Sequence, residues 1–176
     1  MTPRLVITAL VSVFTCSACA TSASRAPQST PSTRERFSHP EELVLADSAE
    51  FRPLDRRIAP RYPPDARVAG EEAAFIAVAV LDTAGRFEKP SITFLGPASS
   101  RFRDTVCDYL NRERFAPVMR ADHRRRAVFV IPLVFALTGG EWQGKTLSDK
   151  PVRDPMEDQG IATYIPQLDS LPHCAS

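Results

Sequence analysis

AAFIAVAVLDTAG, residues 73–85, is the stretch that sets the fold class. Up to Leu81 it is apolar on both faces of an extended chain: Phe75 and Leu81 face one way, and Ile76 and Val80 face the other. Its β-branched residues favour a strand over a helix. A strand with two apolar faces is typical of one that is covered on both sides or lies centrally in a sheet.

A turn is predicted directly after this strand, at Asp82-x-x-Gly85. Aspartate can accept hydrogen bonds from its own following backbone, and glycine adopts a positive φ at low cost. The returning strand is expected at residues 90–95, with Ile92 and Phe94 on one face. These features predict an antiparallel hairpin.

A helix is predicted next. Ser99 and Ser100 offer its cap, and it ends near Arg112. Apolar residues recur at i, i+4, i+7 and i+8, the spacing of one buried helical face: Phe102, Val106, Tyr109 and Leu110.

The last strand is expected at residues 127–137, after an extended exit at residues 115–118 and a polar turn at residues 122–126. Pro132 lies inside this strand. Proline cannot donate to a ladder, so this strand is predicted to be a sheet edge or to be interrupted there. The predicted class is α+β: a small antiparallel sheet in β-β-α-β order with one helix packed on a face.

Several motifs of this region follow one another in a particular order: Tyr62-Pro63, Gly70, Asp82-x-x-Gly85, Phe115-x-Pro117 and Ile131-Pro132-x-x-Phe135. The ordered set resembles the carboxy-terminal domain of TonB-type energy transducers, over about half of the chain. Ala73 stands where that family usually has a second glycine.

The resemblance implies recognition of an extended segment, the TonB box, of an outer-membrane receptor or of a similar segment of another envelope protein. Such recognition needs an exposed strand edge. It also implies contact with inner-membrane motor proteins, although residues 5–23 lack the histidine through which the founding members couple to that motor. The candidate partner-binding residues are Arg56, Arg57, Arg61, Tyr62, Pro63, Val134, Phe135 and Leu137.

Residues 1–20 are typical of an export segment, with Arg4 before the apolar run 5–14. Three outcomes stay open: cleavage after the A-x-A pattern that ends at Ala20, acylation of Cys19 at a lipobox-like sequence, or retention as a membrane anchor. Each places the protein in the bacterial cell envelope, on the periplasmic side and, in the last two cases, attached to a membrane.

The flanks are rich in proline and polar residues. Residues 21–50 are expected to form a flexible Ser/Thr/Pro-rich tether, residues 51–138 the compact domain, and residues 139–176 an irregular tail. In an oxidising compartment Cys107 and Cys174 allow a disulfide, or one is a small buried residue and the other a free thiol.

The formal net charge is only +1, which argues against a nucleic-acid partner. His39, His123 and His173 show no metal-ligand spacing with each other or with the cysteines, and no serine lies in a nucleophile-elbow context. We therefore expect no catalytic site, cofactor or metal. The leading hypothesis is a membrane-tethered protein-binding module linked to energy transduction or transport across the outer membrane. The alternative is an outer-membrane lipoprotein with the same fold that acts as a structural or assembly factor.

Overall fold

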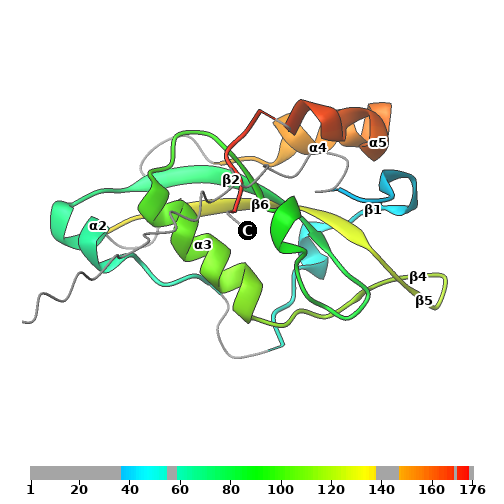
Figure 1. The fold of residues 1–176 in the computed structure, drawn as a ribbon, viewed down its shortest axis with the longest axis horizontal. Helices are drawn as coiled ribbons and strands as arrows, with labels where there is room; N and C mark the ends of the chain where they lie inside the picture. The colour runs from blue at the N-terminus through cyan, green and yellow to red at the C-terminus, as the bar shows by residue number, and fades with distance from the viewer. Residues whose placement is uncertain (1–36, 55–58, 138–146, 169, 175–176) are drawn as a thin grey trace, which may run out of the picture.

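The computed structural model describes residues 37–54, 59–137, 147–168 and 170–174 (Figure 1). It is a mixed α+β protein, as the sequence predicts. The helices and strands, in chain order, are β1 (Val44–Leu45), α2 (Pro64–Ala69), β2 (Ala73–Leu81), β3 (Thr93–Leu95), α3 (Ser100–Arg112), β4 (Val118–Arg120), β5 (His123–Arg125), β6 (Ala127–Phe135), α4 (Lys150–Gln159) and α5 (Ile161–Tyr164).

The main sheet has four strands in the order β1-β6-β2-β3. β2 and β6 pair antiparallel along their whole lengths, from Ala73 opposite Phe135 to Leu81 opposite Ala127. β3 is antiparallel to β2, but β1 runs parallel to β6, so the sheet is mixed rather than purely antiparallel. β4 and β5 form a separate hairpin that extends beyond one end of the main sheet (Figure 1).

The prediction that residues 21–50 form a flexible tether is wrong from residue 37 onward. Phe37, Leu43 and Ala46 are buried, and β1 pairs with the start of β6. The apolar side chains of this short segment are therefore part of the core rather than of a linker. Residues 21–36 lie outside the described residues.

The predicted turn after β2 is confirmed. Asp82 Oδ1 accepts the N–H groups of Ala84 and Arg86, each at 2.8 Å, and the carbonyl of Asp82 accepts the N–H of Gly85 at 3.1 Å. Gly85 has φ 80°. The chain returns through a 3-10 turn at Lys89–Ser91 into β3, so the connection is longer than a tight hairpin.

Helices cover both faces of the sheet, so the expectation of one helix on one face is wrong. α3 packs on the face that carries Phe75, Phe129 and Phe135. The opposite face, which carries Val78 and Val130, is covered by α4, α5 and the 3-10 turn Ile165–Leu168 (Figure 1).

The expected irregular tail, residues 139–176, is helical over much of its described length. Val152 and Met156 are one turn apart on α4 and are both buried against the sheet, followed by buried Tyr164. The prolines of α4 hide this pattern in the sequence: Pro151 lies in the first turn, where proline is tolerated, whereas Pro155 lies inside the helix. Burial of these apolar side chains outweighs the poor helix propensity.

Arginine side chains from other parts of the domain hold the N-terminal segment in place. Arg126 Nη1 donates to the carbonyl of Ser38 at 2.6 Å, Arg120 Nη2 to that of Leu45 at 3.3 Å, and Arg153 Nη2 to that of Ala46 at 2.8 Å. Together with β1, these bonds attach residues 38–46 to the domain.

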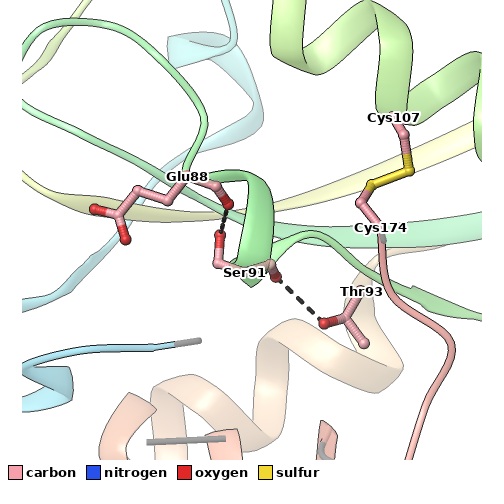
Figure 2. Close-up of a disulfide and its surroundings, with 5 residues drawn as sticks. All are labelled: Glu88, Ser91, Thr93, Cys107 and Cys174. Atoms are coloured by element: carbon pink, nitrogen blue, oxygen red, sulfur yellow. Dashed lines mark hydrogen bonds between the residues drawn. A yellow bond between two sulfur atoms is a disulfide. The ribbon is translucent and has the colours of Figure 1, made fainter. Parts of the chain in front are cut away.

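The C-terminal residues are joined to the domain by a disulfide between Cys107 on α3 and Cys174 (Figure 2), with their Cα atoms 5.8 Å apart. Of the two alternatives left open by the sequence, the structure has the disulfide. Residues 172–174 also lie antiparallel along β3: the N–H of Phe94 donates to the carbonyl of Pro172 at 2.8 Å, and the N–H of Cys174 to that of Ile92 at 3.0 Å. The outer side of β3 is therefore covered by these residues, which we call the C-terminal strap.

Candidate functional site: the open edge of β6

The side of β6 that faces away from β2 is only partly paired. β1 pairs with Ala127 and Val128, and the last bond of this ladder runs from the N–H of Ala46 to the carbonyl of Val128 at 2.9 Å. Beyond that point the chain leaves the sheet through a 3-10 turn at Ser48–Glu50. From Val130 onward, no strand of the described chain pairs with this side of β6, which we call the open edge.

Backbone parity shows which groups face the open edge. The carbonyls of Arg126 and Val128 point toward β1, where they accept from Val44 and Ala46. Because backbone groups alternate along a strand, the N–H and C=O groups of Val130 and Val134 point the same way. They are the groups that a further strand would use.

Pro132 belongs to the same set. It lies opposite Ile76 in the β2–β6 ladder, but its backbone nitrogen is directed to the open edge, where no ladder bond is lost. The sequence predicts that this strand is a sheet edge or is interrupted at Pro132. In the structure β6 lies between β1 and β2 and its ladder with β2 runs through Pro132 without interruption, but at Pro132 no strand of the described chain pairs with the other side of β6.

A groove of about 460 Å³ runs beside the open edge. Its floor is β6 from Phe129 to Phe135, with Ala136 directly after the strand, and its other walls come from α3 and from the segment that precedes α2. The wall residues are Ser48, Phe51, Ala59, Pro60, Tyr62, Val106, Tyr109 and Leu110. The lining is predominantly apolar and aromatic, as in ligand-binding clefts generally.

Tyr62 is one of the aromatic residues that line the groove. Its ring contacts Phe102 and Phe135 edge-on, at 5.8 Å between centroids in both pairs, and its hydroxyl donates to the carbonyl of Glu71. Burial raises the pKa of the Tyr62 hydroxyl above its usual value, so this group stays neutral. The guanidinium of Arg67 lies over the ring, 5.6 Å from its centroid.

The structure brings some of the predicted partner-binding residues to this site and separates others. Val134 and Leu137 are exposed, 43% and 40%, at the C-terminal end of β6, and Tyr62 lines the groove. Phe135 lines the groove as well, but its side chain is 5% exposed and belongs to the core, so it offers a partner little surface.

The remaining candidates lie elsewhere. Pro63 is buried and precedes α2, so it shapes the entry to that helix. Arg61 is exposed beside a smaller pocket that Asp108 and Arg112 also line. Arg56, Arg57 and the lipidation candidate Cys19 lie outside the described residues.

Sequence reasoning missed Phe51 as a wall of the groove. Residues 52–54 cross to the exit of α3, where the N–H of Ala116 donates to the carbonyl of Arg52 at 2.9 Å and the N–H of Leu54 to that of Arg114 at 2.8 Å. These bonds join segments about sixty residues apart, and no local pattern predicts them.

One group of described residues could reach a metal ion: His39, Glu41 and Glu42 place ligand atoms within 4.8 Å of one another. All three side chains are exposed on one turn, and such groups are common without a bound ion. We therefore assign no metal to them.

Comparison with protein-family models found no match, and comparison with curated proteins found none either. Among the described helices, none combines the length and the hydrophobicity that crossing a bilayer requires. The predicted export or anchor segment, residues 1–20, lies outside the described residues.

Proposed function

We propose that this protein is a binding module of the bacterial cell envelope that captures an extended segment of another protein by strand addition to β6. One observation carries the proposal: the open edge of β6 lies beside an apolar groove. Main-chain bonds to such an edge supply affinity, and side-chain pockets beside it supply specificity.

On the open edge of β6, backbone groups have no strand partner among the described residues. An exposed edge is a template for pairing and is usually shortened, charged or covered in soluble proteins. Here the N–H groups of Val130 and Val134 and the carbonyls of Val130, Pro132 and Val134 stand beside exposed apolar Val134 and Leu137. A partner strand would satisfy these groups and cover this apolar surface in one step.

The resemblance of residues 54–137 to the carboxy-terminal domain of TonB-type transducers supports the same mode of binding. On that reading the partner is a TonB-box-like segment of an outer-membrane receptor, and the module takes part in energy transduction or transport across the outer membrane, tethered through its N-terminal segment. Contact with motor proteins of the inner membrane belongs to this proposal.

A second candidate function is a structural or assembly factor of the envelope, anchored by acylation at Cys19. Two observations favour it. Helices cover both faces of the sheet, and the Cys107–Cys174 disulfide holds the C-terminal strap in place on β3. Diacylation of Cys19 with outer-membrane fractionation supports this candidate, whereas an uncleaved inner-membrane species that crosslinks to motor proteins supports transduction.

The test of strand addition places a photo-crosslinking residue at Leu137 in the full chain, expressed in a Gram-negative host. We expect a discrete adduct that is lost with Val134→Pro, which removes a donor from the open edge, and kept with Val134→Ala, which retains it. Thermal melts check that each variant folds. A crosslinker at Met119, exposed on the β4–β5 hairpin, is the positional control. Equal adducts in both Val134 variants, or the same adduct from Met119, would show that the open edge is not used.

A further inference from the structure

We infer that the captured segment carries large apolar side chains at alternate positions, and that these enter the groove between β6 and α3. The inference rests on the proposed function and adds the chemistry of the partner. It follows from which face of the sheet the groove lies on and from what the groove is made of.

The groove lies on the α3 face of the sheet. Phe129, Ile131 and Phe135 point to that face, because they belong to the core cluster that contains Val106 and Leu110 of α3. A strand added to β6 continues the pleat, so every second residue projects to the same face as its neighbours on β6. Every second side chain of the partner therefore meets the groove.

The existing neighbour of β6 follows the same rule. Val44 of β1 lies opposite Ala127 and packs on the α3-side cluster, while the next residue, Leu45, packs on the opposite cluster. β1 occupies the first part of the β6 edge, and the groove begins where β1 stops. A partner strand there takes the place that a longer β1 would have had.

The size and lining of the groove select large apolar groups. Its volume of about 460 Å³ falls within the usual range of ligand sites, and Val106, Tyr109 and Leu110 face it from α3. A leucine or phenylalanine side chain that enters it removes apolar surface from water on both sides, whereas alanine or serine leaves space that its walls do not fill.

The open edge explains why the occupant is a peptide rather than a hydrocarbon. A lipid chain in the groove would cover the carbonyls of Val130 and Pro132 and the N–H of Val134 without bonding them, and each such buried group costs free energy. An extended peptide satisfies them. The same chemistry that favours an apolar occupant therefore requires that it carry a main chain.

The other alternate residues of the partner face the α4 side of the sheet. There Pro132 and Val134 are exposed, beyond the buried Val130 that α4 and α5 cover. Partner residues at these positions remain in contact with water and can be polar. The predicted partner segment thus alternates apolar and polar residues, as half-buried strands do.

The test uses two acetylated and amidated heptapeptides, Thr-Leu-Thr-Leu-Thr-Leu-Thr and Thr-Ala-Thr-Ala-Thr-Ala-Thr, titrated into the purified full chain. Amide shifts of Val130 and Val134 report strand addition, and the dissociation constants report the groove. We expect the leucine peptide to bind at least about tenfold more tightly than the alanine peptide. Ala136→Leu, which narrows the groove, should reduce the ratio of the dissociation constants of the alanine and leucine peptides. Val68→Leu, at an exposed site on α2, should leave this ratio unchanged.

Failure of this inference differs from failure of the proposed function. If both peptides shift Val130 and Val134 with equal affinity, strand addition stands and the selection of apolar side chains is overturned. If neither peptide shifts these amides, strand addition at the open edge is itself overturned. If the leucine peptide binds but shifts amides of another region, both are overturned.

Discussion

Arg126 and Glu88 form a bidentate ion pair. Arg126 Nε donates to Glu88 Oε1 and Arg126 Nη2 donates to Glu88 Oε2, both at 2.7 Å. Glu88 lies after the turn that ends β2, and Arg126 directly precedes β6. The side chains are only 18% and 24% exposed. The hydrogen bond with Glu88 is the main reason that the pKa of Arg126 is raised, and the same guanidinium holds the carbonyl of Ser38.

Arg126→Lys should therefore destabilise the protein by about 2 kcal/mol, because a single ammonium cannot make the forked contact and the bond to Ser38 together. The loss should be greatest in the N-terminal segment. Hydrogen exchange of Val44 and Ala46, whose N–H groups donate to the carbonyls of Arg126 and Val128, measures it directly. Arg124→Lys, at an exposed position of β5, is the control. Unchanged protection of Val44 would contradict the role given to Arg126.

Glu50 predicts a dependence of stability on acid pH. The hydrogen bond from Arg120 is the main cause that lowers the pKa of Glu50 in the folded protein. Since the folded pKa is lower than the unfolded one, this contribution is present above the unfolded value of about 4.3 and disappears as the pH falls through the folded pKa. Glu50→Gln should lower the free energy of unfolding by about 1 kcal/mol at pH 6 and by little at pH 2. Urea unfolding at both values measures the difference, with Asp104→Asn on α3 as control.

The disulfide predicts a large effect on the free energy of unfolding. Cys107 and Cys174 are 67 residues apart in sequence, so the bond closes a long loop. Cys107→Ala with Cys174→Ala should cost about 4 kcal/mol on the chain-entropy model. The reduced protein and the double-alanine variant should have similar urea midpoints, and both midpoints should be lower than that of the oxidised protein. A reduced wild-type protein as stable as the oxidised one would contradict this.

Two glycines with similar backbone geometry should respond differently to alanine. Gly85 and Gly70 have φ of 80° and 67°. A Cβ at Gly85 meets the carbonyl oxygen of Phe115, whereas a Cβ at Gly70 meets nothing within 4 Å. Gly85→Ala should cost about 3 kcal/mol and Gly70→Ala about 1 kcal/mol, the strain of a left-handed alanine alone. Equal costs, measured by thermal unfolding, would show that the contact with Phe115 relaxes freely.

The parts of the fold that sequence predicts are those with a local signal. β2 is a continuous apolar run with β-branched residues, the turn at Asp82 has a turn motif, and α3 has a clear helical period and begins and ends where expected. Even there a detail differs: Ser99 occupies the N-cap position, but its side chain makes no capping hydrogen bond.

The missed parts depend on contacts distant in sequence. β1 has two residues, too few for any period, and exists because β6 and the arginines hold it. The β4–β5 hairpin turns through Ala121 and Asp122, both with positive φ, where no glycine marks the turn. At the site, the sequence points to Val134, Leu137 and Tyr62 but not to Phe51, because the groove forms only when residues 51–60 cross beside α3.

The C-terminal strap has a consequence for assembly. A sheet with two open edges is complementary to itself, because the edge of one copy can add to the opposite edge of the next and the chain of copies can grow without end. Here the strap occupies the β3 side and the disulfide keeps it there, while the other end of the described main sheet is the two-residue strand β1, beside the open edge of β6. A second copy that added to the open edge of β6 would find the β3 side already covered, so addition of β6 to β3 could not repeat from copy to copy into a fibre.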